Sequence, residues 1–357
     1  MSIYIIAEAG VNHNGDIELA KRLIDAAVEA GADAVKFQTF RADEVAIPEA
    51  PKAAYQKQTT DGAESQLEMI RKLQLSESVH RDLVAHCAAR GIRFLSTPFD
   101  LLSLDFLVRG LGLSTLKIPS GEITNGPLLL SAAQSGCDLI LSTGMSTLED
   151  IEEALGILAF GFSGDTSEPE AAAFRVAFLS ETGRAVLRKK VTLLHCTTAY
   201  PTPYADANLK VMAALAEKFG LAVGYSDHTP GIAVAAAAAA LGATIIEKHF
   251  TMDRDLPGPD HQASLEPDEL TTMVEAVRNV EAALGRPEKT PAPAEQGNMA
   301  IARKSLVTLK PIAAGEVFSV ENLGIKRPGN GISPMQYWHW IGRPAPRDFP
   351  EGVLVSE

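Results

Sequence analysis

The chain has 357 residues, of which 46% are hydrophobic and 22% charged, and its formal net charge is −13. This length predicts one large domain of roughly 250 residues together with a small one. The acidic balance and the lack of a Lys/Arg block argue against nucleic-acid binding, and no apolar stretch reaches the ~18 residues of a membrane-spanning helix.

The N-terminal sequence MSIYIIAEAG enters a strand pattern directly, without a basic region before its apolar run. The three cysteines, Cys87, Cys137 and Cys196, lie far apart, are odd in number and form no CxxC motif. We therefore expect reduced thiols and a cytoplasmic enzyme.

Short β-branched runs alternate with amphipathic or alanine-rich helical segments through the first 285 residues. Asp16 and the capping-box spacing of Ser146 to Glu149 mark helix starts, whereas Gly31, Gly91 and Gly242 stand where helices should end. The predicted strands are Tyr4–Glu8, Ala34–Gln38, Arg93–Ser96, Thr115–Ile118, Asp138–Ser142, Val191–Cys196, Ala222–Ser226 and Thr244–His249.

Eight strands that alternate with helices are compatible with a doubly wound sheet or with a closed barrel. Polar residues occur at the C-terminal end of nearly every predicted strand, and a (β/α)8 barrel gathers these ends around one mouth, where its active site lies. Neither GxGxxG nor GxxxxGK[ST] is present, which argues against dinucleotide-binding and P-loop folds. The pattern therefore favours an α/β fold, a (β/α)8 TIM barrel, over residues 1–284.

Two segments interrupt the alternation of strands and helices. Residues 161–190 are polar and are predicted to form a surface excursion with a helix. Residues 285–298 are rich in Pro and charge, which is typical of a linker. Residues 299–357 combine short apolar runs with Gly and Pro turns and predict a small domain of short strands, too small to be very stable unless it is docked.

Two histidines, His228 and His249, are separated by 21 residues, about the length of one βα unit. In a parallel sheet this spacing returns the chain to the same edge, so that both imidazoles would overhang one face and could share an ion. The alternative is a buried strand histidine beside an ordinary turn residue. Four further polar residues near the same strand ends favour a site: Ser226, Asp227, Lys248 and Asp260.

Motifs spread along almost the full length identify a resemblance to a known family. They are IIAEAGVNHNGD (5–16), AVKFQTF (34–40), STPFD (96–100), KIPSGE (117–122), LSTGM (141–145), HCTTAYPTPY (195–204), GYSDHT (224–229), EKHFT (247–251), GPDHQASLEPDEL (258–270) and KRPGNGISP (326–334). In this order they resemble the sialic acid synthases, which make nonulosonic acids from phosphoenolpyruvate (PEP) and an N-acetylated hexosamine. Residues 301–332 resemble the antifreeze-like (SAF) domain of that family.

The resemblance implies a barrel with an antifreeze-like cap, assembled as a domain-swapped homodimer. It implies PEP and N-acetylmannosamine as substrates, converted with water into N-acetylneuraminate and phosphate by C–O cleavage of PEP. The alternative acceptor is 2,4-diacetamido-2,4,6-trideoxymannose, which would give N,N'-diacetyllegionaminate. The two sugars differ by a C4 acetamido group and a missing C6 hydroxyl, and the motifs do not decide between them.

An anion cradle for PEP is expected from two lysines at strand ends. Lys36 lies between the apolar Val35 and Phe37, so it points opposite to them, into the barrel or its mouth, although most strand lysines face solvent. Together with Lys117 it would hold PEP, helped by the hydroxyls of Ser120, Ser142 and Ser226. An asparagine often found near HCTTAY in the family is replaced here by Thr197 and Thr198.

The remaining roles follow from the chemistry that the resemblance implies. His228 and His249 would hold a divalent ion, Mn²⁺ or alternatively Mg²⁺ or Co²⁺, that polarises the sugar aldehyde. Glu8 would orient or deprotonate the attacking water, unless it is a partner of Lys36, and Glu122 is the alternative base. The resemblance points to these residues for the sugar: Gln38, Tyr200, Asp260 and Arg327 of the partner subunit.

Two other functions are compatible with parts of this pattern. A Schiff-base aldolase would use Lys117 or Lys36 and would need no metal. A binding protein with an inert barrel is the second alternative, but the joint presence of Glu8, two lysines and both histidines argues against it.

Overall fold

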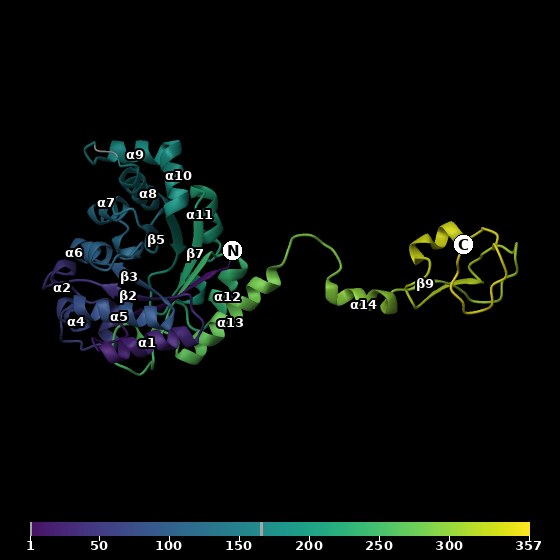
Figure 1. The fold of residues 1–357 in the computed structure, drawn as a ribbon, viewed down its shortest axis with the longest axis horizontal. Helices are drawn as coiled ribbons and strands as arrows, with labels where there is room; N and C mark the ends of the chain where they lie inside the picture. Colours follow the sequence, from purple (N-terminus) through teal and green to yellow (C-terminus); the bar gives the residue numbers. More distant parts are fainter. Residues whose placement is uncertain (1, 165–166) are drawn as a thin grey trace. The chain divides into compact units, whose positions relative to one another are not determined.

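The computed structural model describes residues 2–164 and 167–357, and the chain forms two units, Met1–Gly285 and Arg286–Glu357. The first unit is built on eight parallel strands, which helices surround in Figure 1. The strands are β1 (Tyr4–Gly10), β2 (Ala34–Thr39), β3 (Arg93–Pro98), β4 (Thr115–Ile118), β5 (Asp138–Ser142), β6 (Val191–His195), β7 (Ala222–Asp227) and β8 (Ile245–His249). Each predicted strand is present, with ends that differ by at most two residues.

The sheet closes into a barrel. Its hydrogen-bonded order is β3-β2-β1-β8-β7-β6-β5-β4, which leaves β3 and β4 at the two ends. At the start of β3, Arg93 donates from Nη2 to Ser114 Oγ (3.3 Å) and to Thr115 Oγ1 (3.2 Å), so the two end strands are neighbours. The predicted (β/α)8 barrel is confirmed.

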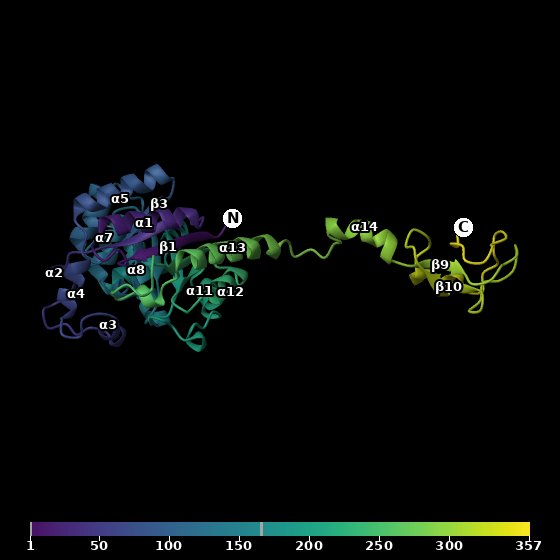
Figure 2. The ribbon, with the colours of Figure 1, turned by 90° about the horizontal axis from the view of Figure 1, so that it is seen from below.

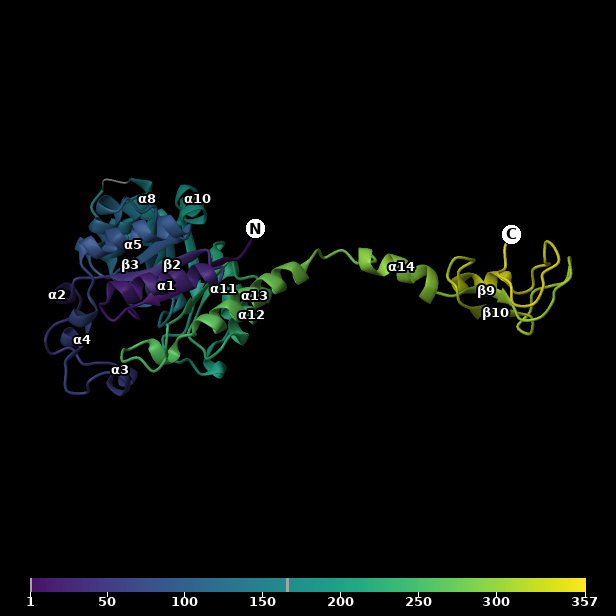
Figure 3. The ribbon, with the colours of Figure 1, turned by 60° about the horizontal axis from the view of Figure 1, so that its bottom comes forward.

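The barrel helices follow the strands in chain order, with three short ones, α2, α3 and α4, inserted between β2 and α5. Figures 2 and 3 show these three helices grouped on one side of the barrel. The helices are α1 (Ile17–Glu29), α2 (Ala42–Val45), α3 (Ala54–Thr59), α4 (Gln66–Leu73), α5 (Glu77–Arg90), α6 (Leu101–Asp105), α7 (Gly126–Gln134), α8 (Leu148–Ser163), α9 (Ala171–Leu179), α10 (Glu181–Lys190), α11 (Val211–Phe219), α12 (Ala233–Ala240) and α13 (Pro267–Leu284).

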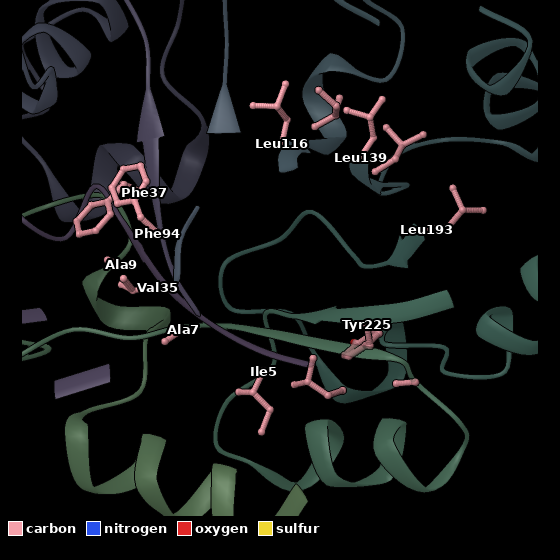
Figure 4. Packing of buried hydrophobic residues seen from close by; sticks show 14 of the residues in the cluster. Ile5, Ala7, Ala9, Val35, Phe37, Phe94, Leu116, Leu139, Leu193 and Tyr225 are labelled. Atoms are coloured by element: carbon pink, nitrogen blue, oxygen red, sulfur yellow. The ribbon is translucent and has the colours of Figure 1, made fainter. Parts of the chain in front are cut away.

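Alternation of side chains along each strand divides the core in two. One set packs between the strands and the helices; it includes Phe37 and Phe94, whose rings stack with centroids 5.7 Å apart (Figure 4). The other set fills the inside of the barrel: Ile6, Ala34, Leu95, Ile140, Leu194 and Ile245. Two residues further along the strands, most inward positions become polar, so this apolar layer lies beneath a polar chamber.

The polar segment 161–190 is more regular than predicted. Its first residues continue α8, and it then forms two helices, α9 and α10. Phe174 of α9 packs edge-on against Phe160 of α8, with ring centroids 5.2 Å apart. α10 leads directly into β6 and buries Leu187. The segment is therefore part of the helical layer; residues 165–166 lie outside the described chain.

The second unit has a small core of its own. A helix, α14 (Pro293–Ala302), lies partly within the stretch 285–298 that was expected to be a linker. It is followed by the antiparallel pair β9 (Ser305–Thr308) and β10 (Leu323–Lys326) and by the short α15 (Tyr337–Trp340). Buried members of this core are Leu306, Ile312, Phe318, Leu323, Trp340 and Phe349. Among the described helices of both units, none is long and apolar enough to cross a membrane.

Candidate active site

A cavity of about 380 Å³ opens at the C-terminal ends of the barrel strands. Most of the residues predicted for the site line it: Glu8, Lys36, Gln38, Lys117, Ser120, Ser142, Tyr200, Ser226, His228, His249 and Asp260. They converge because the register of the sheet sets them side by side. Glu8 of β1 pairs with Lys36 of β2 on one side and with His249 of β8 on the other.

Two lysines and two carboxylates alternate across the floor of this cavity. Lys36 Nζ lies 2.7 Å from Glu8 Oε2 and 3.7 Å from Glu247 Oε2. From β4, on the other side of the barrel, Lys117 Nζ lies 3.1 Å from Glu247 Oε1, which also accepts a hydrogen bond from Ser226 Oγ at 2.8 Å. All four charged side chains are almost completely buried. The prediction that Lys36 points into the barrel is confirmed.

Glu247 is a site residue that the sequence reasoning missed. It lines the cavity and connects both lysines. A signal was available, because Glu247 and His249 are two positions apart on one strand and so must face the same side. On this strand, only Lys248 and His249 were singled out from the sequence.

The two carboxylates are driven toward opposite protonation states. Burial raises the pKa of Glu8 to about 7, although Lys36 offsets part of that effect. Burial also opposes ionisation of Glu247, but the charges of Lys117 and Lys36 outweigh it and hold the pKa of Glu247 below its usual value. Near neutral pH, Glu247 is therefore ionised while Glu8 exchanges a proton.

His228 and His249 lie together at the mouth, with ring centroids 5.4 Å apart. His228 donates from Nδ1 to the Thr197 carbonyl oxygen at 2.7 Å, so Nε2 of the neutral ring carries the lone pair. Burial lowers the pKa of His228 to about 4. Burial, followed by the repulsion that would arise if both rings were charged, lowers the pKa of His249 well below its usual value. Both rings are thus neutral, as metal ligands must be.

The donor set at the mouth fits a divalent ion held in part by the substrate. His249 Nδ1 is buried and has no hydrogen-bond partner among the described residues, and Asp260 Oδ2 lies 3.9 Å from it. Across the described chain, no group of three or more His, Cys, Asp or Glu residues could hold a metal. The protein therefore offers two imidazoles, and oxygen atoms of substrate or water would complete the coordination.

Hydroxyl groups and a thiol form a bay beside Lys117. Gly144 donates its backbone N–H to Ser120 Oγ at 3.0 Å, and Ser120 Oγ lies 3.1 Å from Cys196 Sγ. A Cβ on Gly144 would stand 2.4 Å from Thr198 Oγ1 and 2.8 Å from Ser120 Oγ, so only glycine lets these groups converge. Thr198 thus brings a hydroxyl into the cavity from the HCTTAY stretch.

Some expectations about this edge need correction. Asp227 and Lys248 form a buried ion pair (2.8 Å) and do not line the cavity, because they alternate with Ser226, Glu247 and His249 along β7 and β8. Their position near the strand ends therefore suggested a place in the site, but their side chains face the other side of the sheet.

Glu122, a predicted site residue of the barrel, is not part of the cavity lining. Glu122 accepts a hydrogen bond from Asn125 Nδ2 (2.6 Å) near the start of α7, where burial raises its pKa. Arg327 belongs to the second unit, where it is exposed and donates from Nε to the Ala302 carbonyl oxygen (3.1 Å).

The chain matches two family models. Residues 23–289 match the NeuB family and residues 303–357 match the SAF domain. The chain is similar to proteins named N,N'-diacetyllegionaminic acid synthase from Campylobacter jejuni (48% identity, 99% of this chain and 98% of the relative) and Legionella pneumophila (46%, 96% and 90%). It also resembles the solved structure of an N-acetylneuraminic acid synthetase from Leptospira borgpetersenii (33% identity, TM-score 0.67, 84% of this chain and 90% of that one).

Proposed function

The chain belongs to the NeuB family, and from that premise we propose that its acceptor is 2,4-diacetamido-2,4,6-trideoxymannose and its product N,N'-diacetyllegionaminate. The family makes it a PEP-dependent nonulosonic acid synthase, a transferase. The observation that carries the choice of acceptor is the higher identity to the two N,N'-diacetyllegionaminic acid synthases than to the N-acetylneuraminic acid synthetase. It replaces the expectation that N-acetylmannosamine is the acceptor.

The test is direct identification of the product. Purified protein is incubated with PEP and either sugar, and the nine-carbon acid and the released phosphate are quantified. A 5,7-diacetamido nonulosonic acid formed from the diacetamido sugar supports the proposal. N-acetylneuraminate as the faster-formed product would overturn it.

The reaction has a fixed balance of bonds. C3 of PEP forms a carbon–carbon bond to C1 of the sugar aldehyde, whose oxygen takes up a proton. Water then adds to the cationic C2 of PEP and loses a proton, and cleavage of the C2–O bond releases phosphate. The net change joins PEP, sugar and water into the nonulosonic acid and phosphate.

The buried cations are the groups that would hold PEP. Lys36 and Lys117 each have a carboxylate partner, so their ammonium groups are fixed before substrate arrives. The bay of Ser120, Gly144, Cys196 and Thr198 next to Lys117 supplies hydroxyl donors suited to a phosphate. Ser142 Oγ is buried and has no partner among the described residues, which leaves its donor for the same anion.

A divalent metal ion, which enzymes of this family generally use, would be held by His228 and His249 and would supply Lewis-acid polarisation of the aldehyde oxygen. Gln38, Tyr200 and Asp260 would orient the sugar at the same mouth. We further propose that the ion is Mn²⁺ and that the protein forms a domain-swapped homodimer in which Arg327 of the partner subunit reaches the sugar.

Glu8 is the group we assign to the proton of the attacking water. Its pKa of about 7 lets the carboxylate accept a proton near neutral pH. Because only the ionised form is a base, kcat/KM for PEP should rise roughly tenfold between about pH 6 and pH 8 and then level off.

Comparison with Glu8→Gln separates this limb from the titration of PEP itself, whose phosphate loses its last proton near pH 6. The variant should be slow, and its dependence of kcat/KM on pH should show only the titration of the PEP phosphate. An unchanged profile in Glu8→Gln would assign the base to another group.

A further inference from the structure

The cavity has two chemically different ends. Its floor carries the charged cluster of Glu8, Lys36, Lys117 and Glu247. Its outer end is lined by residues that follow the strands, Val11 after β1, Phe40 after β2 and Phe99 after β3, and by the segment 40–73, which runs from the end of β2 through α4. We call seven lining residues of this end the outer wall: Val11, Phe40, Gln66, Met69, Ile70, Leu73 and Phe99; Val45 and Gln56 of the same segment also line the cavity.

The outer wall is almost entirely apolar. Val11, Phe40 and Leu73 are buried and pack with Ile70 and Phe99 in a cluster separate from the main core. The rings of Phe40 and Phe99 meet edge to face, with centroids 6.2 Å apart. A methyl group set against such a surface gains burial, whereas a hydroxyl group there would lose its hydrogen bonds to water without replacement.

Gln66 is the amide within this wall. It is the first residue of α4, and the start of that helix is fixed by a capping box: Ser65 N–H donates to Glu68 Oε2 (2.8 Å), and Glu68 N–H donates to Ser65 Oγ (3.2 Å). Within the described chain its side chain makes no hydrogen bond. The other amide of the segment, Gln56, already accepts from Ala53 N–H at 2.9 Å.

The reaction orients the sugar between these two ends. Bond formation joins C1 of the sugar to PEP, so C1 must lie at the lysine floor, where the anion is held. The far end of the sugar, C4 to C6, then extends away from the floor, toward the outer wall. In 2,4-diacetamido-2,4,6-trideoxymannose this end carries one amide and one methyl group.

We propose that the outer wall selects the acceptor: Gln66 pairs with the C4 acetamido group, and the apolar patch around Ile70 receives the C6 methyl group. The inference rests on the proposed function and deepens it by naming residues of this chain that discriminate the diacetamido sugar from N-acetylmannosamine. Both substrate groups are matched by chemistry already present in the wall. N-acetylmannosamine would present a C6 hydroxyl group to the apolar patch and no amide to Gln66.

Four mannose-configured acceptors test the two contacts separately. All carry the C2 acetamido group, and they combine either a hydroxyl or an acetamido group at C4 with either a hydroxymethyl or a methyl group at C6. kcat/KM is measured for each sugar with wild type, Gln66→Met and Ile70→Thr. Arg71→Met is the matched control, because Arg71 lies on the same helix but outside the cavity, in an exposed ion pair with Asp43.

Each variant should lose one preference and keep the other. Gln66→Met should reduce the advantage of the C4 acetamido group about five- to tenfold, the usual worth of one hydrogen bond, and leave the C6 preference unchanged. Ile70→Thr should reduce the advantage of the C6 methyl group roughly tenfold and leave the C4 preference unchanged. Arg71→Met should change neither ratio. If Gln66→Met does not fold, Gln66→Glu, which keeps an acceptor but loses the amide donors, takes its place.

The outcomes separate the two proposals. If wild type prefers the diacetamido sugar but its C4 and C6 preferences persist in the folded variants, the outer wall does not select the acceptor, and the proposed function stands. If wild type prefers N-acetylmannosamine, the proposed function falls, and the selection by Gln66 and Ile70 falls with it.

Discussion

Replacing Lys117 with methionine should lower kcat/KM for PEP by roughly 30- to 1,000-fold. A cation at a desolvated anion site contributes ~2–4 kcal/mol of transition-state stabilisation. Lys117 is buried, and its removal leaves Lys36 as the remaining cation beside Glu247, so the site loses one of the two positive charges that would face the phosphate. Lys36→Met should have an effect of the same size, because Lys36 neutralises both Glu8 and Glu247.

Two further variants separate catalysis from stability. Lys218→Met removes an exposed lysine that is paired with Glu152 and should leave PEP kinetics unchanged. In Lys117→Met/Glu247→Gln the buried charge pair is gone, so stability should recover relative to Lys117→Met while activity stays low. Unchanged PEP kinetics in a folded Lys117→Met would show that this lysine only supports the barrel.

Chelation of divalent ions should abolish turnover, and added Mn²⁺ should restore it. Removing the Lewis acid withdraws several kcal/mol of stabilisation from the developing alkoxide, so we expect a loss of about 10³-fold or more. His228→Ala and His249→Ala should each fold, show a lower metal content by elemental analysis and remain inactive when Mn²⁺ is added. His86→Ala removes a histidine paired with Asp25 outside the cavity and should behave as wild type.

The same experiment tests the Schiff-base alternative. An aldolase that used Lys117 or Lys36 would keep its activity in a chelator and would be trapped by borohydride with pyruvate. Full activity of a metal-free sample would therefore contradict the assignment of the two histidines. Membership of the NeuB family supports the opposite result.

The barrel and its inward lysine could be predicted because their signals are local and strong. β-Branched runs bounded by helix caps gave each strand to within two residues of its ends. The alternation of Lys36 with the buried Val35 and Phe37 fixed the side of the sheet that it faces. A spacing of one βα unit likewise brought His228 and His249 together at the mouth.

The errors in the predicted site arise because a shift of one residue along a strand moves a side chain to the other face of the sheet. Glu247 and Lys248 are neighbours in sequence, yet the first lines the cavity and the second pairs with Asp227 away from it. Closeness to the end of a strand predicts closeness to the mouth, but only alternation predicts the side. Applied to β8 from His249, alternation would have identified Glu247.

The α4 part of the outer wall had no comparable signal in the sequence. α2 and α4 are short, and contacts distant in sequence fix the segment: Ala42 N–H donates to Gln74 Oε1 (2.9 Å), and Gly258 N–H donates to the Thr59 carbonyl oxygen (3.4 Å). Val11, Phe40 and Phe99 do lie within the motifs that carry the family resemblance, but the wall residues of α4 lie outside them. If the α4 residues select the acceptor, as we propose, the motifs alone could not choose between the two sugars.

Competition between the two sugars for limiting PEP tests the central claim most directly. With equimolar 2,4-diacetamido-2,4,6-trideoxymannose and N-acetylmannosamine in one reaction, the ratio of the two products equals the ratio of their kcat/KM values. We predict that N,N'-diacetyllegionaminate exceeds N-acetylneuraminate by about 50- to 100-fold, because one hydrogen bond contributes about five- to tenfold and one buried methyl group roughly tenfold. A product mixture dominated by N-acetylneuraminate would contradict the account.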